Sequence, residues 1–234
     1  MKNYFITATD TDAGKTFVAC AIIQALINTG IKVAAYKPVS AGCEQTEQGL
    51  INEDARLLYQ FANANQTITD INPIAFADPI APHIAAQRAN QEISLTDISR
   101  CYTNVTALDV DINLTEGAGG WRLPLSIDNK SFLSDFAIAT KQQVILIVNM
   151  KLGCLNHALL TYEAIKADGL TCVGWVANQA SSDAMSNLSE NIASLEQLLP
   201  MPKLAELAFD DSEQDLLAKI KAAAIQINVQ PLIS

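Results

Sequence analysis

The feature that most constrains this chain is the sequence Gly14-Lys15-Thr16, which lies between a strand-like and a helix-like segment. Tyr4 to Thr7 is the apolar run of a buried strand, and residues 15–28 repeat apolar side chains near helical spacing until Gly30 ends the helix. A phosphate-binding P-loop needs this setting, because its backbone N–H groups, lysine and hydroxyl act at the start of a helix. We therefore predict a nucleotide-phosphate loop over residues 8–16.

The rest of the chain alternates strand-like and helix-like segments. Further strands are predicted at residues 32–36, 111–115, 144–148, 171–177 and 203–207, and further helices at 52–62, 94–107, 155–166 and within 184–223. Residues 40–49 are expected to form a polar loop, and residues 72–82, with three prolines, an irregular segment. This alternation predicts an α/β fold: a doubly wound, mainly parallel sheet with helices on both faces. Because no segment resembles a linker, we expect residues 1–234 to form a single domain.

Composition narrows the classes of partner. The formal net charge of −10 disfavours nucleic acid as a partner, because phosphate contacts need clustered lysine and arginine. Five scattered cysteines form no CxxC pair, which is typical of reduced thiols in the cytoplasm. We see no secretory signal and no apolar run long enough to span a membrane. A cytoplasmic enzyme that acts on small molecules is the expectation.

Polar side chains follow the ends of several predicted strands, where ligands bind in a doubly wound sheet. The phosphate loop has Gly14, Lys15 and Thr16 in place, but Thr9 stands where a leading glycine is usual. Lys37 directly follows the second strand, and by position alone it is as consistent with a surface lysine as with a ligand-facing one. Glu116 closes an apolar strand, the usual place of a second Mg²⁺ support in P-loop enzymes.

Two other segments are weaker candidates. Asp54 could be a further metal carboxylate, although on its own an ordinary helix N-terminal charge explains it better. Residues 151–157 begin a helix after the central strand, where a carboxylate or phosphate could dock. We expect His83 and His157 to be ordinary structural histidines and Trp121 to be a packing residue.

Taken together, ordered motifs between residue 4 and about residue 210 resemble the dethiobiotin synthetase family. They are Thr9-Asp10-Thr11, Gly14-Lys15-Thr16, Tyr36-Lys37-Pro38-Val39, Glu116-Gly117-Ala118-Gly119-Gly120, Lys151-Leu152-Gly153-Cys154-Leu155-Asn156-His157 and Gly174-Trp175-Val176-Ala177-Asn178. The resemblance implies a P-loop ligase that uses ATP and Mg²⁺ to close a ureido ring on 7,8-diaminononanoate with CO₂. It also implies a homodimer in which the two subunits share each active site.

The resemblance further implies residue roles. Lys15 and Lys37 would be catalytic, and Thr16, Asp54 and Glu116 would hold Mg²⁺. The implied ATP contacts are Asp12, Ala13, Gly14, Lys15, Thr16, Phe17, Asp54, Glu116, Gly117, Ala118, Gly119, Asn178, Gln179, Ala208, Phe209 and Asp210, with Asn178 recognising adenine. The implied substrate contacts are Thr11, Lys37, Ala41, Gly153, Cys154 and Asn156, the last three at a helix start from the partner subunit.

The chain departs from the family pattern at several substrate and nucleotide contacts. Ala8 replaces a frequent glycine, Ala41 a serine or threonine, Gln179 an acid and Ala208 a proline, and residues 180–199 contain no tyrosine. The adjacent Ser40 is no automatic substitute for Ala41, because neighbouring residues of an extended chain face opposite ways.

Three other classes compete with this interpretation, and one of them, a non-catalytic nucleotide-binding remnant, is disfavoured by the intact lysine and carboxylate set. Partitioning or site-selection ATPases share the predicted fold, but they carry a signature lysine where this chain has Asp10. Amidase-type ring-forming ligases usually add a glutaminase domain, which 234 residues leave no room for.

Overall fold

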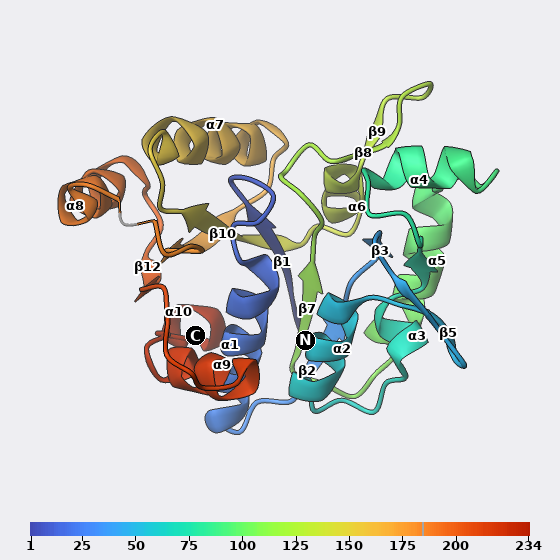
Figure 1. The fold of residues 1–234 in the computed structure, drawn as a ribbon, viewed down its shortest axis with the longest axis horizontal. Helices are drawn as coiled ribbons and strands as arrows, with labels where there is room; N and C mark the ends of the chain where they lie inside the picture. The colour runs from blue at the N-terminus through green and yellow to red at the C-terminus, as the bar shows by residue number, and fades with distance from the viewer. Residues whose placement is uncertain (184) are drawn as a thin grey trace.

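The computed structural model describes residues 1–183 and 185–234, and its centre is a six-stranded sheet (Figure 1). The strand order is β12-β11-β10-β1-β7-β2, and every neighbouring pair is parallel. The strands are β1 (Lys2–Ala8), β2 (Val33–Tyr36), β7 (Ile112–Glu116), β10 (Gln143–Asn149), β11 (Cys172–Asn178) and β12 (Lys203–Leu207). The predicted parallel α/β fold is confirmed.

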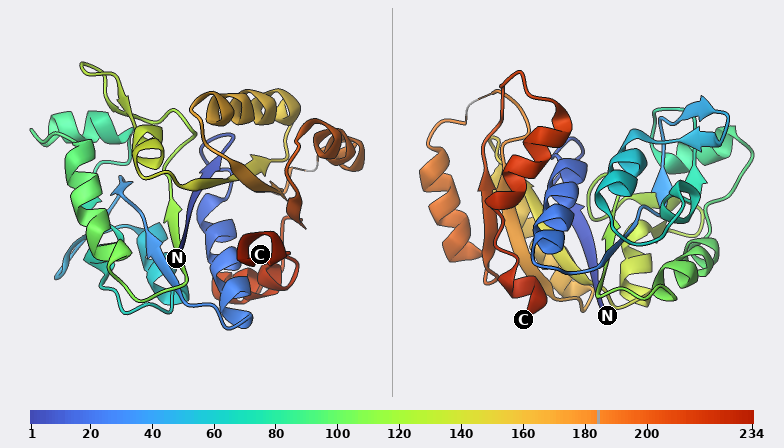
Figure 2. Two further views of the ribbon diagram at one scale, coloured as in Figure 1. Left: turned by 180° about the vertical axis from the view of Figure 1, so that it is seen from behind. Right: turned by 90° about the horizontal axis from the view of Figure 1, so that it is seen from below.

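Helices cover both faces of this sheet (Figure 2). Along β10, Ile145 and Ile147 point to one core while Val144, Leu146 and Val148 point to the other, as the two-residue period of a strand requires. The first core packs against α1 (Lys15–Asn28), α2 (Glu53–Phe61), α3 (Ile68–Ile71), α9 (Leu216–Ile225) and α10 (Gln230–Ile233). The second packs against α4 (Pro82–Arg88), α5 (Leu95–Thr106), α6 (Leu133–Ala139), α7 (Cys154–Ala167) and α8 (Leu188–Leu198). In the described part of the chain, no helix has the length and apolar character needed to cross a membrane.

The structure corrects the sequence prediction at short elements. Residues 40–49 are not simply a loop, because β4 (Glu44–Thr46) and β5 (Gly49–Ile51) form a hairpin in which Gly49, at φ 101°, begins the second strand. Two more pairs, β3 (Val39–Ser40) with β6 (Ile74–Ala75) and β8 (Pro124–Ser126) with β9 (Ser131–Phe132), were not predicted, nor were α3, α4, α6 and α10. These pieces are too short to show a period. The last predicted helix–strand–helix set was placed from about residue 184, which lies outside the described residues, and its first helix, α8, begins at Leu188.

The edge strand β2 is covered by the buried amide of Gln66. Its Oε1 accepts a hydrogen bond from the Ala35 backbone N–H at 2.9 Å, and its Nε2 donates to the Ala35 carbonyl at 2.9 Å. Nearby, Asn63 Oδ1 accepts from the Val33 N–H at 2.7 Å. Side-chain amides thus occupy the backbone groups of an edge that could otherwise pair with another chain.

We expect Gln66→Ala to lower the free energy of unfolding by about 2 kcal/mol, because it leaves both backbone groups of Ala35 buried without a partner. The midpoint of urea denaturation measures this loss. Gln48→Ala, at an exposed glutamine, is the control and should change stability by less than about 0.5 kcal/mol. Equal midpoints for the two variants would contradict the assignment.

Candidate active site

The predicted phosphate loop follows β1 and begins α1. Asp12 and Gly14 adopt left-handed backbone conformations, with φ of 55° and 76°, and Gly14 is the N-cap of α1. Asn178, at the end of β11, donates from Nδ2 to the Ala13 carbonyl at 2.9 Å. A Cβ added to Gly14 would lie 2.4 Å from that Nδ2. Both its conformation and this close approach therefore require glycine at residue 14.

Thr9 accounts for the missing leading glycine. Its backbone N–H donates to the Ile147 carbonyl at 2.9 Å, and its hydroxyl accepts from the Asn149 N–H at 3.1 Å. It is not among the described residues with positive φ, so its conformation does not call for glycine. The hydroxyl instead ties the start of the loop to the end of β10.

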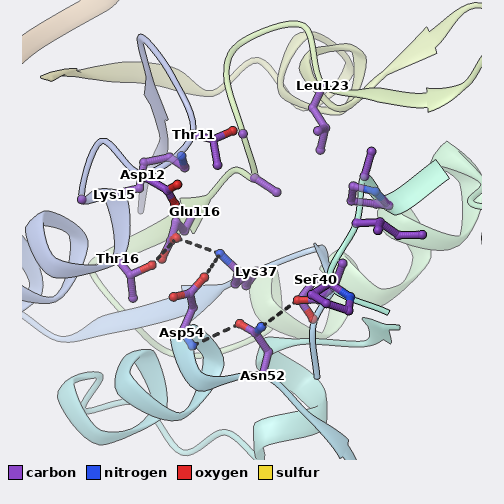
Figure 3. Close-up of a pocket in the computed structure, with 18 of the residues that line it drawn as sticks. Thr11, Asp12, Lys15, Thr16, Lys37, Ser40, Asn52, Asp54, Glu116 and Leu123 are labelled. Atoms are coloured by element: carbon purple, nitrogen blue, oxygen red, sulfur yellow. Dashed lines mark hydrogen bonds and ion pairs between the residues drawn. The ribbon is translucent and has the colours of Figure 1, made fainter. Parts of the chain in front are cut away.

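Lys37, Asp54, Glu116 and Thr16 form a compact polar cluster beside this loop (Figure 3). The Lys37 ammonium lies 2.8 Å from Asp54 Oδ2 and 2.8 Å from Glu116 Oε1. Thr16 Oγ1 donates to the same Glu116 oxygen at 2.7 Å. Lys37 directly follows β2, Glu116 ends β7, and Thr16 lies in the first turn of α1. Asp54 lies in the first turn of α2, which the Asn52 side chain caps by accepting from the Asp54 N–H.

Sheet register explains why the lysine and the glutamate meet. On β7, Thr115 is the partner of Tyr36, the last residue of β2, and Glu116 is the partner of Ile6 on β1. Lys37 therefore leaves β2 at the level where Glu116 ends β7. The parallel register of the sheet thus brings these two strand ends together.

The charges of the cluster are strongly coupled. Burial by itself lowers the pKa of Lys37, but the carboxylates of Glu116 and Asp54 outweigh it, so the pKa lies above its usual value. Burial raises the pKa of Glu116 against the opposing effect of Lys37. For Asp54 the effect of burial is overcome, chiefly by Lys37, and its pKa lies below the usual range.

Lys15 is buried without a carboxylate at bonding distance in the described residues. Its ammonium donates to the Asp10 carbonyl at 3.3 Å, and its side chain is almost covered, at 8% exposure. Burial lowers its pKa, and the neighbouring charge of Lys37 adds to this while Glu116 opposes it. A buried cation of this kind is stabilised by an anionic ligand such as a phosphate.

These groups open onto one cavity of about 640 Å³. Twelve of the predicted site residues line this cavity, namely Thr11, Asp12, Gly14, Lys15, Thr16, Phe17, Lys37, Ala41, Asp54, Glu116, Ala118 and Gly119. Sequence reasoning missed seven lining residues, which are Ser40, Asn52, Pro79, Ile80, Ala81, Pro82 and Leu123. The proline-rich character of residues 72–82 was the one available signal for most of this apolar wall.

The remaining predicted contacts lie outside the lining of this cavity. Ala13 is a buried residue of the phosphate loop itself, and Gly117 packs tightly, since an added Cβ would lie 3.0 Å from the Phe5 ring. Asn178 contacts the phosphate loop through its bond to the Ala13 carbonyl, and the Gln179 N–H donates to the Leu207 carbonyl at 2.9 Å. That bond places Gln179 beside the segment that carries the last three predicted nucleotide contacts, which are Ala208, Phe209 and Asp210.

The start of α7 lies near the phosphate loop. Lys151, just before it, forms an ion pair with Asp10 at 2.5 Å. Gly153 is the N-cap of α7 at φ 95°, Cys154 is buried, and Asn156 is exposed. The predicted substrate residues of this segment therefore lie together at one helix N-terminus, apart from the cavity lining.

The donor set of the cavity fits Mg²⁺. Thr16, Asp54 and Glu116 supply hydroxyl and carboxylate oxygens, which are the ligands that hard divalent cations prefer. Glu116 Oε2 is buried with no hydrogen-bond partner in the described residues, an arrangement that costs free energy until a cation or donor reaches it.

We expect Gly14→Ala to weaken ATP binding at least about tenfold, because the new methyl group must displace either the loop or Asn178. Titration calorimetry with a non-hydrolysed ATP analogue measures the effect. Gly30→Ala is the control at positive φ, since a Cβ there meets nothing within 4 Å. The Gly30→Ala variant has the same strain of an alanine at positive φ. Equal losses of ATP affinity in the two variants would therefore contradict the role of the close approach between Gly14 and Asn178.

Comparison with known proteins agrees with this geometry. A protein-family profile described as an AAA domain matches residues 2–214. In fold, MinD of Pyrococcus horikoshii, solved with Mg-ADP, has a TM-score of 0.55 at 14% identity, covering 95% of this chain and 86% of that one. A ParA family ATPase of Chlorobium tepidum has a TM-score of 0.53 at 14% identity, covering 98% and 93%.

Sequence relatives are much closer than these structural neighbours. An ATP-dependent dethiobiotin synthetase BioD of Alteromonas mediterranea is 48% identical, covering 89% of this chain and 93% of its own length. Those of Aeromonas salmonicida and Pseudomonas aeruginosa are each 45% identical, covering 94% and 88% of this chain and 97% and 90% of their own lengths. At this identity and coverage, the chain belongs to the ATP-dependent dethiobiotin synthetase family.

Proposed function

We propose that this protein is an ATP-dependent dethiobiotin synthetase, a ligase of biotin biosynthesis that joins CO₂ to 7,8-diaminononanoate and gives dethiobiotin, ADP and phosphate. The observation that carries the proposal is the buried ammonium of Lys37, held between Asp54 and Glu116 beside the phosphate loop. A P-loop needs one lysine for the phosphates. A second fixed cation in the same cavity suits a reaction in which another anion meets the γ-phosphate.

In this reaction one substrate amine adds to CO₂ and loses a proton, which gives a carbamate. A carbamate oxygen attacks the γ-phosphorus, the bond to the ADP oxygen breaks, and a carbamic–phosphoric mixed anhydride forms. The second amine then attacks the carbamoyl carbon and loses a proton, the ring closes, and phosphate leaves with the bonding electrons.

The chain's own residues position these groups and stabilise their charge. Lys15 lies along the phosphates, and Lys37 stabilises the negative charge that develops between the carbamate and the γ-phosphoryl group. Thr16, Asp54 and Glu116 hold Mg²⁺, which neutralises phosphate charge when it is bound. Because the pKa of Lys37 is raised, its ammonium stays charged through neutral and mildly alkaline pH.

The outer contacts complete the proposal. Asn178 commits its Nδ2 to the Ala13 carbonyl, so its Oδ1 is the atom to accept a hydrogen bond from the amino group of adenine. The start of α7, where Gly153 and Asn156 are exposed and Cys154 is buried, takes the tail carboxylate of a substrate bound by the partner subunit. The protein is then a cytoplasmic homodimer in which residues 1–234 act as one catalytic domain.

The fold is also that of partitioning and site-selection ATPases, but the loop disfavours that function. Asp10 stands at the position of their signature lysine and is itself paired with Lys151. A carboxylate cannot supply the cation that this position contributes in that class.

Release of ADP in the presence of MgATP, bicarbonate and 7,8-diaminononanoate tests the proposed function. We expect ADP release to require the diamine and dethiobiotin to accumulate in equal amount. If ADP release is independent of the diamine, the synthetase function is wrong and a switch-type ATPase becomes the better account.

A further inference from the structure

The backbone of Lys37 is held on both sides by one neighbouring segment. The Lys37 N–H donates to the Ile71 carbonyl at 2.7 Å, and the Lys37 carbonyl accepts from Asn72 Nδ2 at 2.8 Å. Pro38 follows and has no N–H of its own to contribute. These two bonds therefore fix the point from which the lysine side chain enters the cavity.

The amide of Asn72 is itself oriented by Ser40. The Ser40 hydroxyl donates to Asn72 Oδ1 at 2.6 Å and lies 3.1 Å from Cys43 Sγ. Because Oδ1 takes the hydroxyl proton, the donor end of the amide is the one that faces the Lys37 carbonyl. Ser40 is 2% exposed and Asn72 is 7% exposed, so water has little access to compete for these bonds.

We propose that Asn72 is a positioning residue for Lys37 and that Ser40 sets the orientation of its amide. The proposal rests on the proposed function, in which the Lys37 ammonium stabilises charge during phosphoryl transfer. Asn72 does not line the cavity that Lys37 and Ser40 line in the described residues, so it acts through the lysine and not on the substrate. A displacement of about 1 Å in such a group can cost about a hundredfold in rate.

The same geometry shows what the Ser40 hydroxyl does next to Ala41. Ala41 has no hydroxyl, whereas Ser40 has one and turns it inward to Asn72. Sequence reasoning that Ser40 does not simply replace the missing hydroxyl agrees with this geometry. The hydroxyl serves the lysine backbone instead.

A purely structural role for Asn72 makes a different prediction. In that case its loss would resemble the loss of Gln66, a buried amide in the same connection that bonds both backbone groups of Ala35 on β2. Gln66→Ala is therefore a matched control, because it removes comparable hydrogen bonds two residues before Lys37 without touching the lysine itself.

The experiment compares Asn72→Ala, Ser40→Ala, the double variant and Gln66→Ala in diamine-dependent ADP release, with melting temperatures measured alongside. We expect Asn72→Ala to lower kcat at least about tenfold with KM for ATP within about twofold of wild type. Ser40→Ala should lower kcat by a smaller factor. The double variant should have the kcat of Asn72→Ala, because Ser40 and Asn72 both act through the hydrogen bond from Asn72 to the Lys37 carbonyl. Gln66→Ala should lose stability with kcat kept.

Two results would overturn the proposal. One is a kcat for Asn72→Ala no lower than that of Gln66→Ala. The other is a rise in KM for ATP that accounts for the whole loss of kcat/KM in Asn72→Ala. If Asn72→Ala does not fold, Ser40→Ala decides, and an unchanged kcat overturns the proposal. If wild-type ADP release ignores the diamine, the proposed function fails instead, and the same ratios are then measured on the basal hydrolysis of ATP.

Discussion

Lys37→Ala should lower kcat by about a thousandfold while ATP still binds. The ammonium lies 2.8 Å from each of two carboxylates, inside the cavity that the phosphate loop lines. In the proposed mechanism its loss removes the fixed cation from the point where negative charge develops during phosphoryl transfer, and the loss of one preorganised group of this kind costs about a hundredfold or more in rate. Lys15 and the loop N–H groups still hold the phosphates, so the Kd for ATP should stay within about threefold of wild type.

The measurement is single-turnover formation of ADP at saturating ATP and diamine, with ATP affinity from calorimetry. Lys32→Ala is the matched control, because Lys32 directly precedes β2 at its opposite end and its half-exposed side chain pairs with Asp109 at 3.7 Å. Truncation of Lys37 also leaves Asp54 and Glu116 without their counter-ion, so stability must be checked with MgATP bound. Near-normal turnover in a folded Lys37→Ala protein would remove the lysine from the mechanism.

Local sequence patterns are enough to predict the parallel fold and the proximity of Lys37 and Glu116. Apolar runs such as Val144 to Val148 mark buried strands, and parallel strands bring their carboxyl ends to one edge. Polar residues that directly follow strands were therefore predictable site residues. Asp54 was ambiguous alone, because a helix N-terminal carboxylate has a common structural explanation.

What escaped prediction depends on contacts between distant segments. Asn72 bonds a carbonyl that lies 35 residues earlier in the chain, and no local pattern distinguishes it from a turn asparagine. The cavity wall at Pro79 to Pro82 faces the site because of tertiary packing, although its prolines had indicated an irregular segment. Thr9 looked like a defect in a motif, and the bond from the Asn149 N–H to its hydroxyl is visible only when β10 lies beside it.

Glu116→Gln is expected to have the second large effect, through the metal. Glu116 is 1% exposed, and its Oε1 already accepts from both Thr16 and Lys37. Its Oε2 is buried with no partner in the described residues, and we therefore expect this oxygen to complete the proposed Mg²⁺ site. The amide keeps the shape but loses the charge, so we expect the Mg²⁺ concentration for half-maximal turnover to rise at least about tenfold and kcat to fall about a hundredfold.

A titration with Mg²⁺, in which ADP formation is measured at saturating ATP, distinguishes a loss of metal binding from a loss of the lysine's effect on kcat. If Glu116 holds the cation, Glu116→Gln shifts the Mg²⁺ midpoint, whereas Lys37→Ala lowers kcat with the midpoint nearly unchanged. Glu206→Gln, at an exposed glutamate of β12, should change neither quantity. A Glu116→Gln protein with the wild-type Mg²⁺ midpoint would mean that the carboxylate serves Lys37 alone. The unpartnered Oε2 would then need another donor, and Asp54 with Thr16 would be left as the metal ligands.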